Sequence, residues 1–183
     1  MDRKRYEKDR ARADRFVDDA KEVLAKIFNT SIDMIKESTV EDDMRQGFDF
    51  LVPSDSSFEP PIRIAWRLRD IKYSYDDIVF RQSPQSNEFR KVLSGHVDYI
   101  LYSWGDFSAK SLDRWVLVNC WRLRDFESVD FFGADKEFST IDRPQIDCRM
   151  LIVPLPILRS WVGVVAAEWT RSKTVIVGLP SVA

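Results

Sequence analysis

Histidine, cysteine and glycine are scarce in this sequence, and each scarcity narrows the kinds of site it can contain. The one histidine, His96, lies in a predicted loop, which favours a surface or capping role over a catalytic triad. Cys120 and Cys148 lie far apart without zinc-site spacing, so we expect two reduced thiols rather than a disulfide framework. The sequence has no glycine-rich phosphate loop, no GxSxG motif and no HExxH motif. Any catalysis is therefore expected to use carboxylates, a metal ion, lysine or arginine.

Long apolar segments are also missing. No apolar run reaches the roughly 18–20 residues that span a bilayer, so no membrane association is expected. The charged start, residues 1–5, is not followed by the apolar segment of a signal peptide, and a cytoplasmic location is predicted. The formal net charge of −2 gives no overall attraction to nucleic acid, although a local basic patch can still bind phosphate.

The composition predicts one folded domain. Hydrophobic residues make up 44% of the 183 residues and aromatic residues 13%, which is enough for a sizeable core. We expect a single α/β domain over residues 1–183. Residues 1–11 would be a frayed extension of the first helix, and residues 126–183 a C-terminal strand–helix extension.

The periodicity of apolar residues predicts the main elements. Residues 2–28 form an amphipathic helix in this prediction, because apolar residues recur at helical spacing opposite a charged face. Residues 62–69 alternate as a strand, with isoleucine, tryptophan and leucine on one side and mainly arginine on the other. The other predicted strands are 47–52, 73–81 (or an irregular edge), 97–104, 115–121, 149–155 and 174–178, and the other predicted helices are 84–94 and 157–169.

This order of helices and strands predicts an α/β fold with a mixed sheet. The near-continuous apolar runs 115–121 and 149–155 are typical of strands covered on both faces. One pentapeptide occurs twice, as Trp66–Asp70 and as Trp121–Asp125. Because the flanking sequences do not align, we interpret this repeat as coincidence rather than duplication.

Asp49 is the first candidate for a functional residue. It lies between Phe48 and Phe50 in a predicted strand, so its side chain points to the face opposite those aromatic rings. A buried charge without a partner is very costly, and three partners remain open: a metal ion, an arginine, or solvent at a sheet edge. Glu41, Asp42 and Asp43 form a further acidic cluster upstream.

A row of arginines provides the second set of candidates. Arg63, Arg67 and Arg69 share one side of their strand, where they can neutralise Asp49 or bind phosphate. Arg81 and Lys91 complete the residues that we predict to bind nucleic acid. Glu88 and Lys91 are three residues apart on a helix, which fits either a surface salt bridge or a part of the site.

The chain resembles the PD-(D/E)XK nuclease superfamily over residues 12–125. The order of a helix (12–28), strands (near 40, 47–52 and 62–70), a helix (86–94) and a strand (97–104) resembles its restriction-endonuclease-like αβββαβ core, in which helices flank a mixed central sheet. Three segments are similar, more narrowly, to a group of bacterial and phage proteins: Glu41-Asp42-Asp43-Met44-(x)4-Asp49, Trp66-Arg67-Leu68-Arg69, and Glu88-(x)2-Lys91-(x)3-Gly95-(x)2-Asp98-Tyr99-(x)2-Tyr102.

The resemblance implies a Mg²⁺ ion held by a strand aspartate and a following carboxylate, with a lysine that helps to activate water. Asp49 matches the first ligand. The place of the E-x-K pair falls on Trp66–Arg69, which contains neither a carboxylate nor a lysine, and arginine stays protonated. One hypothesis is that these groups have moved to the following helix. In that case Asp49 and Glu88 hold Mg²⁺, and Arg67 and Lys91 stabilise charge during phosphodiester hydrolysis.

Two other hypotheses do not require catalysis. In one, a nuclease-like core without activity binds nucleic acid or a protein, as a phage or mobile-element accessory protein does, with a protein partner or a homodimer both open. In the other, exposed aromatic residues form a protein interface. An enzyme requires Asp49 to converge with Glu88 or Asp43, whereas in a binding protein Arg67 or Arg69 neutralises Asp49. An interface protein would expose Trp104, Phe131 or Phe132.

Overall fold

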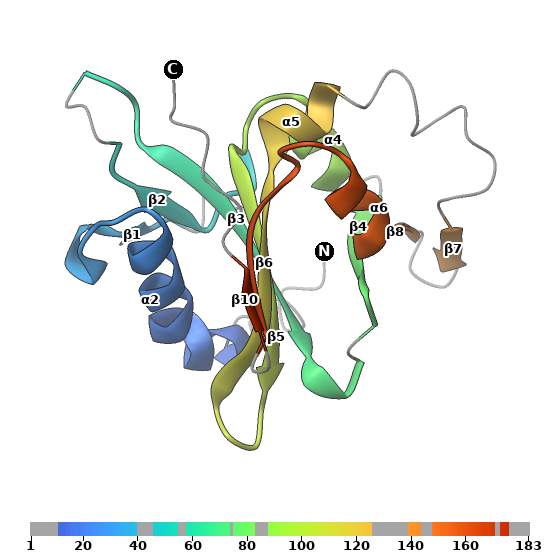
Figure 1. Ribbon diagram of the computed structural model, residues 1–183, viewed down its shortest axis with the longest axis horizontal. Coiled ribbons are helices and arrows are strands. Elements are labelled where there is room, and N and C mark those ends of the chain that lie inside the picture. Colours follow the sequence, from blue (N-terminus) through green and yellow to red (C-terminus); the bar gives the residue numbers. More distant parts are fainter. Residues whose placement is uncertain are drawn as a thin grey trace.

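The computed structural model is an α/β fold with a mixed central sheet and few helices (Figure 1). It describes residues 11–39, 46–54, 58–73, 75–82, 88–125, 139–143, 148–170 and 173–175. Within these ranges, none of the helices has both the length and the apolar character needed to cross a membrane.

The central sheet has seven strands in the order β1-β2-β3-β5-β6-β9-β10. All neighbouring strands are antiparallel except β3 and β5, which run parallel and are joined by a crossover. The crossover contains β4 (Asp77–Gln82) and α4 (Glu88–Leu93). The strands of the sheet are β1 (Lys36–Glu37), β2 (Phe50–Val52), β3 (Ile62–Asp70), β5 (Tyr99–Asp106), β6 (Ser111–Asn119), β9 (Val165–Thr170) and β10 (Lys173–Val175).

The two faces of this sheet are covered by different elements (Figure 1). One face packs against α2 (Val17–Ile27), which follows the short 3₁₀ turn η1 (Asp14–Phe16). The other face packs against a three-stranded sheet in the order β4-β8-β7 and against α4, α5 and α6. The remaining elements are η2 (Ile32–Met34), η3 (Ile71–Tyr73), α5 (Cys120–Asp125), β7 (Ser139–Arg143), β8 (Cys148–Pro154) and α6 (Leu155–Ser160).

The alternation in β3 is confirmed and determines what lies on each face. Ile64 and Trp66 belong to the core under α2, whereas Ala65 belongs to the core under the second sheet. The predicted apolar stripe of the first helix is confirmed as well, since Phe16, Ala20 and Leu24 are fully buried. Residues 1–10 of the predicted helix lie outside the described residues. Because the arginines of β3 share their face with Ala65, they lie on the side of α4 and the second sheet.

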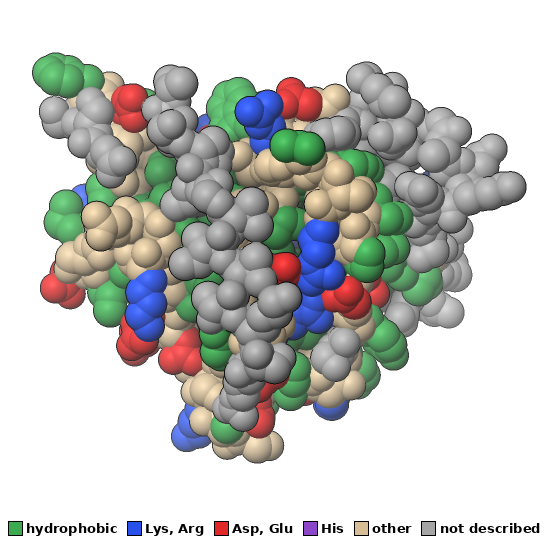
Figure 2. Space-filling model, viewed as in Figure 1, with side chains coloured by type: hydrophobic (Ala, Val, Ile, Leu, Met, Phe, Trp, Pro, Cys, Tyr) green, Lys and Arg blue, Asp and Glu red, His purple; other side chains and the backbone are tan. Residues whose placement is uncertain are grey.

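A group of ion pairs between side chains joins the second sheet to the central one. Asp76, next to the start of β4, pairs with Arg114 of β6 and with Arg159 of α6, which also binds Glu168 of β9 at 2.8 Å. Burial would raise the pKa of Asp76, but the hydrogen bonds from Arg114 and Arg159 outweigh it and lower that pKa. Figure 2 shows basic and acidic side chains next to one another near the middle of this face.

The helix predicted for residues 157–169 is wrong. The helix α6 ends at Ser160, Gly163 adopts a positive φ of 78°, and the chain then enters β9. Val165 and Ala167 pair with Val118 and Leu117 of β6, so this segment extends the central sheet. An apolar run that is covered on both faces fits a buried strand as well as a helix, because it has no polar residues whose spacing would indicate a helical or a strand period.

Two further predictions differ in placement. The segments predicted as strands 73–81 and 149–155 form β4 and β8, which belong to the second sheet and not to the central one. The strand predicted to reach Trp121 ends at Asn119, and α5 begins at Cys120. The side-chain oxygen of Asn119 accepts hydrogen bonds from the backbone N–H groups of Trp121 (2.9 Å) and Arg122 (3.2 Å), which caps the helix. The cap therefore lies where β6 ends and α5 begins, within one apolar segment.

Replacing Asn119 by alanine is expected to lower the free energy of unfolding by about 1 kcal/mol, because two helix N–H groups lose their acceptor. Urea unfolding followed by circular dichroism measures the change. Asn119→Asp keeps an oxygen at the same place and is expected to retain most of the stability. Equal stability of the alanine variant and the wild type would contradict a capping role.

Candidate functional site

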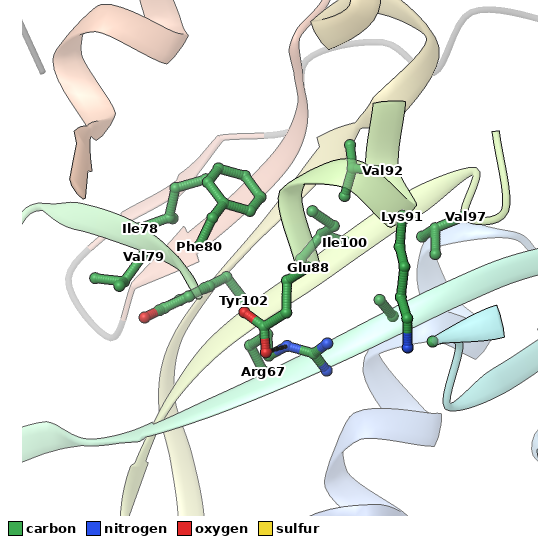
Figure 3. Close-up of a pocket in the computed structure, with 12 residues that line it drawn as sticks. Arg67, Ile78, Val79, Phe80, Glu88, Lys91, Val92, Val97, Ile100 and Tyr102 are labelled. Atoms are coloured by element: carbon green, nitrogen blue, oxygen red, sulfur yellow. Dashed lines mark ion pairs between the residues drawn. The ribbon is translucent and has the colours of Figure 1, made fainter. Parts of the chain in front are cut away.

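Three of the predicted site residues line one small pocket between β3, β4, β5 and α4 (Figure 3). Arg67 enters it from β3, and Glu88 and Lys91 from α4, while apolar side chains form the rest of the wall. The cavity volume is about 20 Å³, which is the space of a water molecule or a bare ion and not of a nucleotide base.

The guanidinium of Arg67 lies between two carboxylates. Its Nη1 is 3.3 Å from Oδ2 of Asp49, and its Nε is 3.2 Å from Oε1 of Glu88. Nη1 also donates to the carbonyl of Trp66 at 2.7 Å. The side chain of Arg67 is 30% exposed, so solvent reaches one side of this arrangement. Asp49 and Glu88 thus both contact the same cation, which belongs to the chain itself.

Asp49 is positioned by the pairing of β2 with β3. Its backbone N–H donates to the carbonyl of Ile64 at 2.8 Å, immediately before β2 begins. Its Oδ2 accepts the backbone N–H of Trp66 at 2.6 Å in addition to the Arg67 contact. Of the three partners that the sequence left open for Asp49, the structure provides an arginine.

Glu88 holds α4 against the two sheets. Its Oε2 accepts the backbone N–H of Arg81 in β4 at 3.0 Å, while its Oε1 faces Arg67 in β3. The carboxylate is 16% exposed. Glu88 therefore links three elements by one side chain, which exceeds the role of a surface salt bridge.

Lys91 packs against the backbone of Gly47. Gly47 has a φ of 81°, and a Cβ at this position would lie 2.6 Å from Cδ of Lys91, so a larger residue would displace the lysine. In Figure 3 the amine of Lys91 and the guanidinium of Arg67 extend to the same side of the pocket. The four residues predicted as catalytic, Asp49, Arg67, Glu88 and Lys91, thus lie in one region.

Tyr102 forms part of the pocket wall. Burial raises the pKa of its phenol, and Arg69, whose Cζ lies 5.3 Å from the ring centroid, opposes this increase. Tyr102 is therefore a neutral group at physiological pH. Cys120, the first residue of α5, is likewise buried, and burial raises the pKa of its thiol, so it stays uncharged.

The predicted arginine row is found on one face of β3, and each member is paired within the protein. Arg63 binds Asp98 through Nε (3.0 Å) and Nη2 (2.9 Å), and Arg69 binds Asp77 at 2.8 Å. Arg81, the remaining arginine predicted to contact nucleic acid, is exposed on β4. The strand row therefore neutralises carboxylates of the protein itself.

The donors at this site do not fit a resident Mg²⁺ ion. Among the described residues, no three His, Cys, Asp or Glu side chains lie close enough to hold a metal, and Asp43 lies outside these residues. Mg²⁺ is commonly held by one or two carboxylates, with water completing its six oxygen ligands, and the two carboxylates here contact the guanidinium of Arg67 instead. Glu22 lies on α2, at the other face of the central sheet, and pairs with Lys26 at 3.8 Å. It therefore adds no carboxylate to this site.

The sequence did not identify Trp121 as a surface residue. Trp121 is 58% exposed on α5, whereas Trp104, named as a marker of an interface, is fully buried. Phe131 and Phe132 lie outside the described residues. The cap at Asn119 was the available indication, because a helix that starts at Cys120 buries Leu123 and turns Trp121 outward. His96 is exposed, as expected for a loop residue.

Comparison of the chain with models of protein families, with curated proteins and with solved structures finds no match.

Proposed function

We propose that this protein binds nucleic acid through a nuclease-like αβββαβ core and does not cleave it by metal-dependent hydrolysis. The observation that carries the proposal is the position of Arg67 between Asp49 and Glu88. The element order supports the nuclease-like core: α2 is followed by the antiparallel strands β1, β2 and β3, then, after β4 of the second sheet, by α4 and by β5, which is parallel to β3.

The argument against hydrolysis rests on what a guanidinium can do. A catalytic Mg²⁺ lowers the pKa of its bound water and polarises a phosphate. Arginine carries a permanent charge and has no acceptor, so it neutralises Asp49 and Glu88 but neither activates water nor accepts a proton. In this arrangement the two carboxylates orient Arg67 and hold α4 against β3 and β4.

The argument for nucleic acid rests on local charge. Around α5 and the adjoining end of β3, three arginines (Arg63, Arg122 and Arg124) accompany two aspartates (Asp98 and Asp125). Among these described residues, Asp98 and Asp125 pair with Arg63 and Arg122, and Arg124 keeps one positive charge, whereas the chain as a whole has a net charge of −2. Phosphate binding depends on local arginine and lysine, and it weakens as salt increases.

The test combines calorimetry with labelled oligonucleotides. We expect titration of wild type with Mg²⁺ or Mn²⁺ to give no binding heat below about 1 mM, which is weaker than a dedicated cation site. Fluorescent single- and double-stranded DNA and RNA of 20 nucleotides are tested for binding between 50 and 200 mM salt and for cleavage. Binding that weakens with salt and leaves the oligonucleotides intact is the expected result.

Two outcomes would overturn the proposal. Cleavage that requires Mg²⁺ and is abolished in Asp49→Ala would make the protein a metal-dependent nuclease. No binding to any of the four nucleic acids at 50 mM salt would remove nucleic acid as the ligand.

A further inference from the structure

Trp121 is exposed, and contacts on the protein side fix the orientation of its indole ring. The ring is 58% exposed, and the Cζ of Arg124 lies 4.3 Å from its centroid. Its Nε1 donates to Oδ1 of Asp98 at 3.2 Å. A large aromatic side chain that is already oriented loses little conformational entropy when a ligand stacks on it.

The surroundings of Trp121 are basic and are connected to the candidate site. Asp98, which anchors the indole, also binds Arg63 on β3, four residues before Arg67 on the same face. The guanidinium of Arg124 donates to the carbonyls of Val92 and Val97, both at 2.9 Å, and these neutral partners leave its positive charge in place.

The neighbouring residues leave the ring accessible. Arg122 is 56% exposed and pairs with Asp125 at 3.5 Å. Its Cγ would lie 3.4 Å from a Cβ added at Gly163, so the turn after α6 lies beside α5. Val162 in that turn is 86% exposed. We call Trp121, Arg122, Arg124 and Val162 the Trp121 surface.

We infer that the Trp121 surface binds single-stranded nucleic acid by stacking an unpaired base on the indole, with Arg122 and Arg124 beside the phosphate backbone. This inference rests on the proposed function. An aromatic platform flanked by arginine binds single strands because each unpaired base offers a π-face, whereas the bases of a duplex are already stacked on one another. Exposed tryptophan is also common in protein–protein interfaces. Contact with a protein is therefore one of the outcomes that the test distinguishes.

The experiment measures the fluorescence anisotropy of fluorescein-labelled dT20, rU20 and a 20-base-pair DNA duplex with full-length protein at 50 mM salt. Trp121→Ala is expected to bind both single strands about 5- to 150-fold more weakly, the effect of removing one base–aromatic stack. Trp121→Phe keeps an aromatic face and is expected to recover most of the affinity. Tyr75→Ala removes a tyrosine that is 64% exposed elsewhere and is the matched control. Binding of the duplex is expected to change less than twofold in all three variants.

The outcomes separate the inference from the proposed function. Wild type that binds single strands with an affinity unchanged in Trp121→Ala overturns the inference and leaves the proposed function standing. Equal loss of single-strand and duplex binding excludes base stacking and also overturns it. If wild type binds none of the three probes, the inference fails, and the proposed function fails with it when double-stranded RNA is not bound either. A change in the sedimentation of Trp121→Ala alone would then assign the surface to contacts between copies of the chain.

Discussion

Replacing Arg67 by glutamine is expected to create a divalent-cation site where the wild type has none. The substitution removes the positive charge that contacts both Asp49 and Glu88, and of these two carboxylates Glu88 lines the small cavity. Like charges in one site repel, and a divalent cation relieves that repulsion. Calorimetric titration with Mn²⁺ is expected to give a Kd of about 10⁻⁴–10⁻³ M, in the range of weak carboxylate sites.

Stability provides a second readout for the same variant. Without metal, we expect Arg67→Gln to lower the free energy of unfolding by about 1–2 kcal/mol, a value discounted for the partial exposure of the pair. Mn²⁺ is expected to restore part of this loss in proportion to its saturation of the site. Arg67→Gln with Asp49→Asn is the control, because it lacks one of the two carboxylates and should not bind the ion. Equal Mn²⁺ affinity of wild type and Arg67→Gln would show that Arg67 does not occupy a cation position.

Much of the candidate site could be predicted from local patterns. The alternation of β3 placed Arg63, Arg67 and Arg69 on one face, and the helical spacing of Glu88 and Lys91 placed both on one side of α4. The choice among the three partners left open for Asp49 could not be made from the sequence, because it depends on the register in which Phe50 pairs with Ile64. Shifting that register by one residue would turn Asp49 to the opposite face.

The repeated pentapeptide shows why local sequence was insufficient elsewhere. As residues 66–70 it lies in the part of β3 that pairs with β5, and Trp66 is 8% exposed and donates to Ser103 Oγ at 2.8 Å. As residues 121–125 it belongs to α5, and Trp121 is 58% exposed. The same five residues adopt both structures because tertiary pairing decides in β3 and the Asn119 cap decides in α5.

The same reasoning explains the incorrect helix at residues 157–169. Its apolar residues fit a helical face, but Gly163 favours a turn, and the residues after it pair as β9 with the edge of β6. A period is informative only where polar residues mark the exposed positions, and this segment has few of them. For this segment the apolar pattern therefore favoured the wrong element.

Removal of the Asp98 carboxylate is expected to weaken both the fold and the Trp121 surface. Asp98 accepts four hydrogen bonds: from the Arg63 backbone N–H (2.8 Å), Nε (3.0 Å) and Nη2 (2.9 Å), and from Trp121 Nε1 (3.2 Å). Its side chain is 13% exposed, so water does not replace these bonds fully in Asp98→Ala. We expect the free energy of unfolding to fall by about 2–3 kcal/mol, since Arg63 is left without its counter-charge.

Two separate measurements test Asp98→Ala: the exposure of the Trp121 indole and the free energy of unfolding. At a temperature where the variant remains folded, acrylamide is expected to quench tryptophan fluorescence more strongly than in wild type, because the ring loses the bond that orients it. Asp98→Asn, which keeps one acceptor oxygen but no charge, should lie between the two proteins in both measurements. A loss below about 0.5 kcal/mol, the range of an ordinary surface substitution, would mean that Asp98 does not join β3 to α5. Normal stability with unchanged quenching would place the orientation of Trp121 under the control of Arg124 alone.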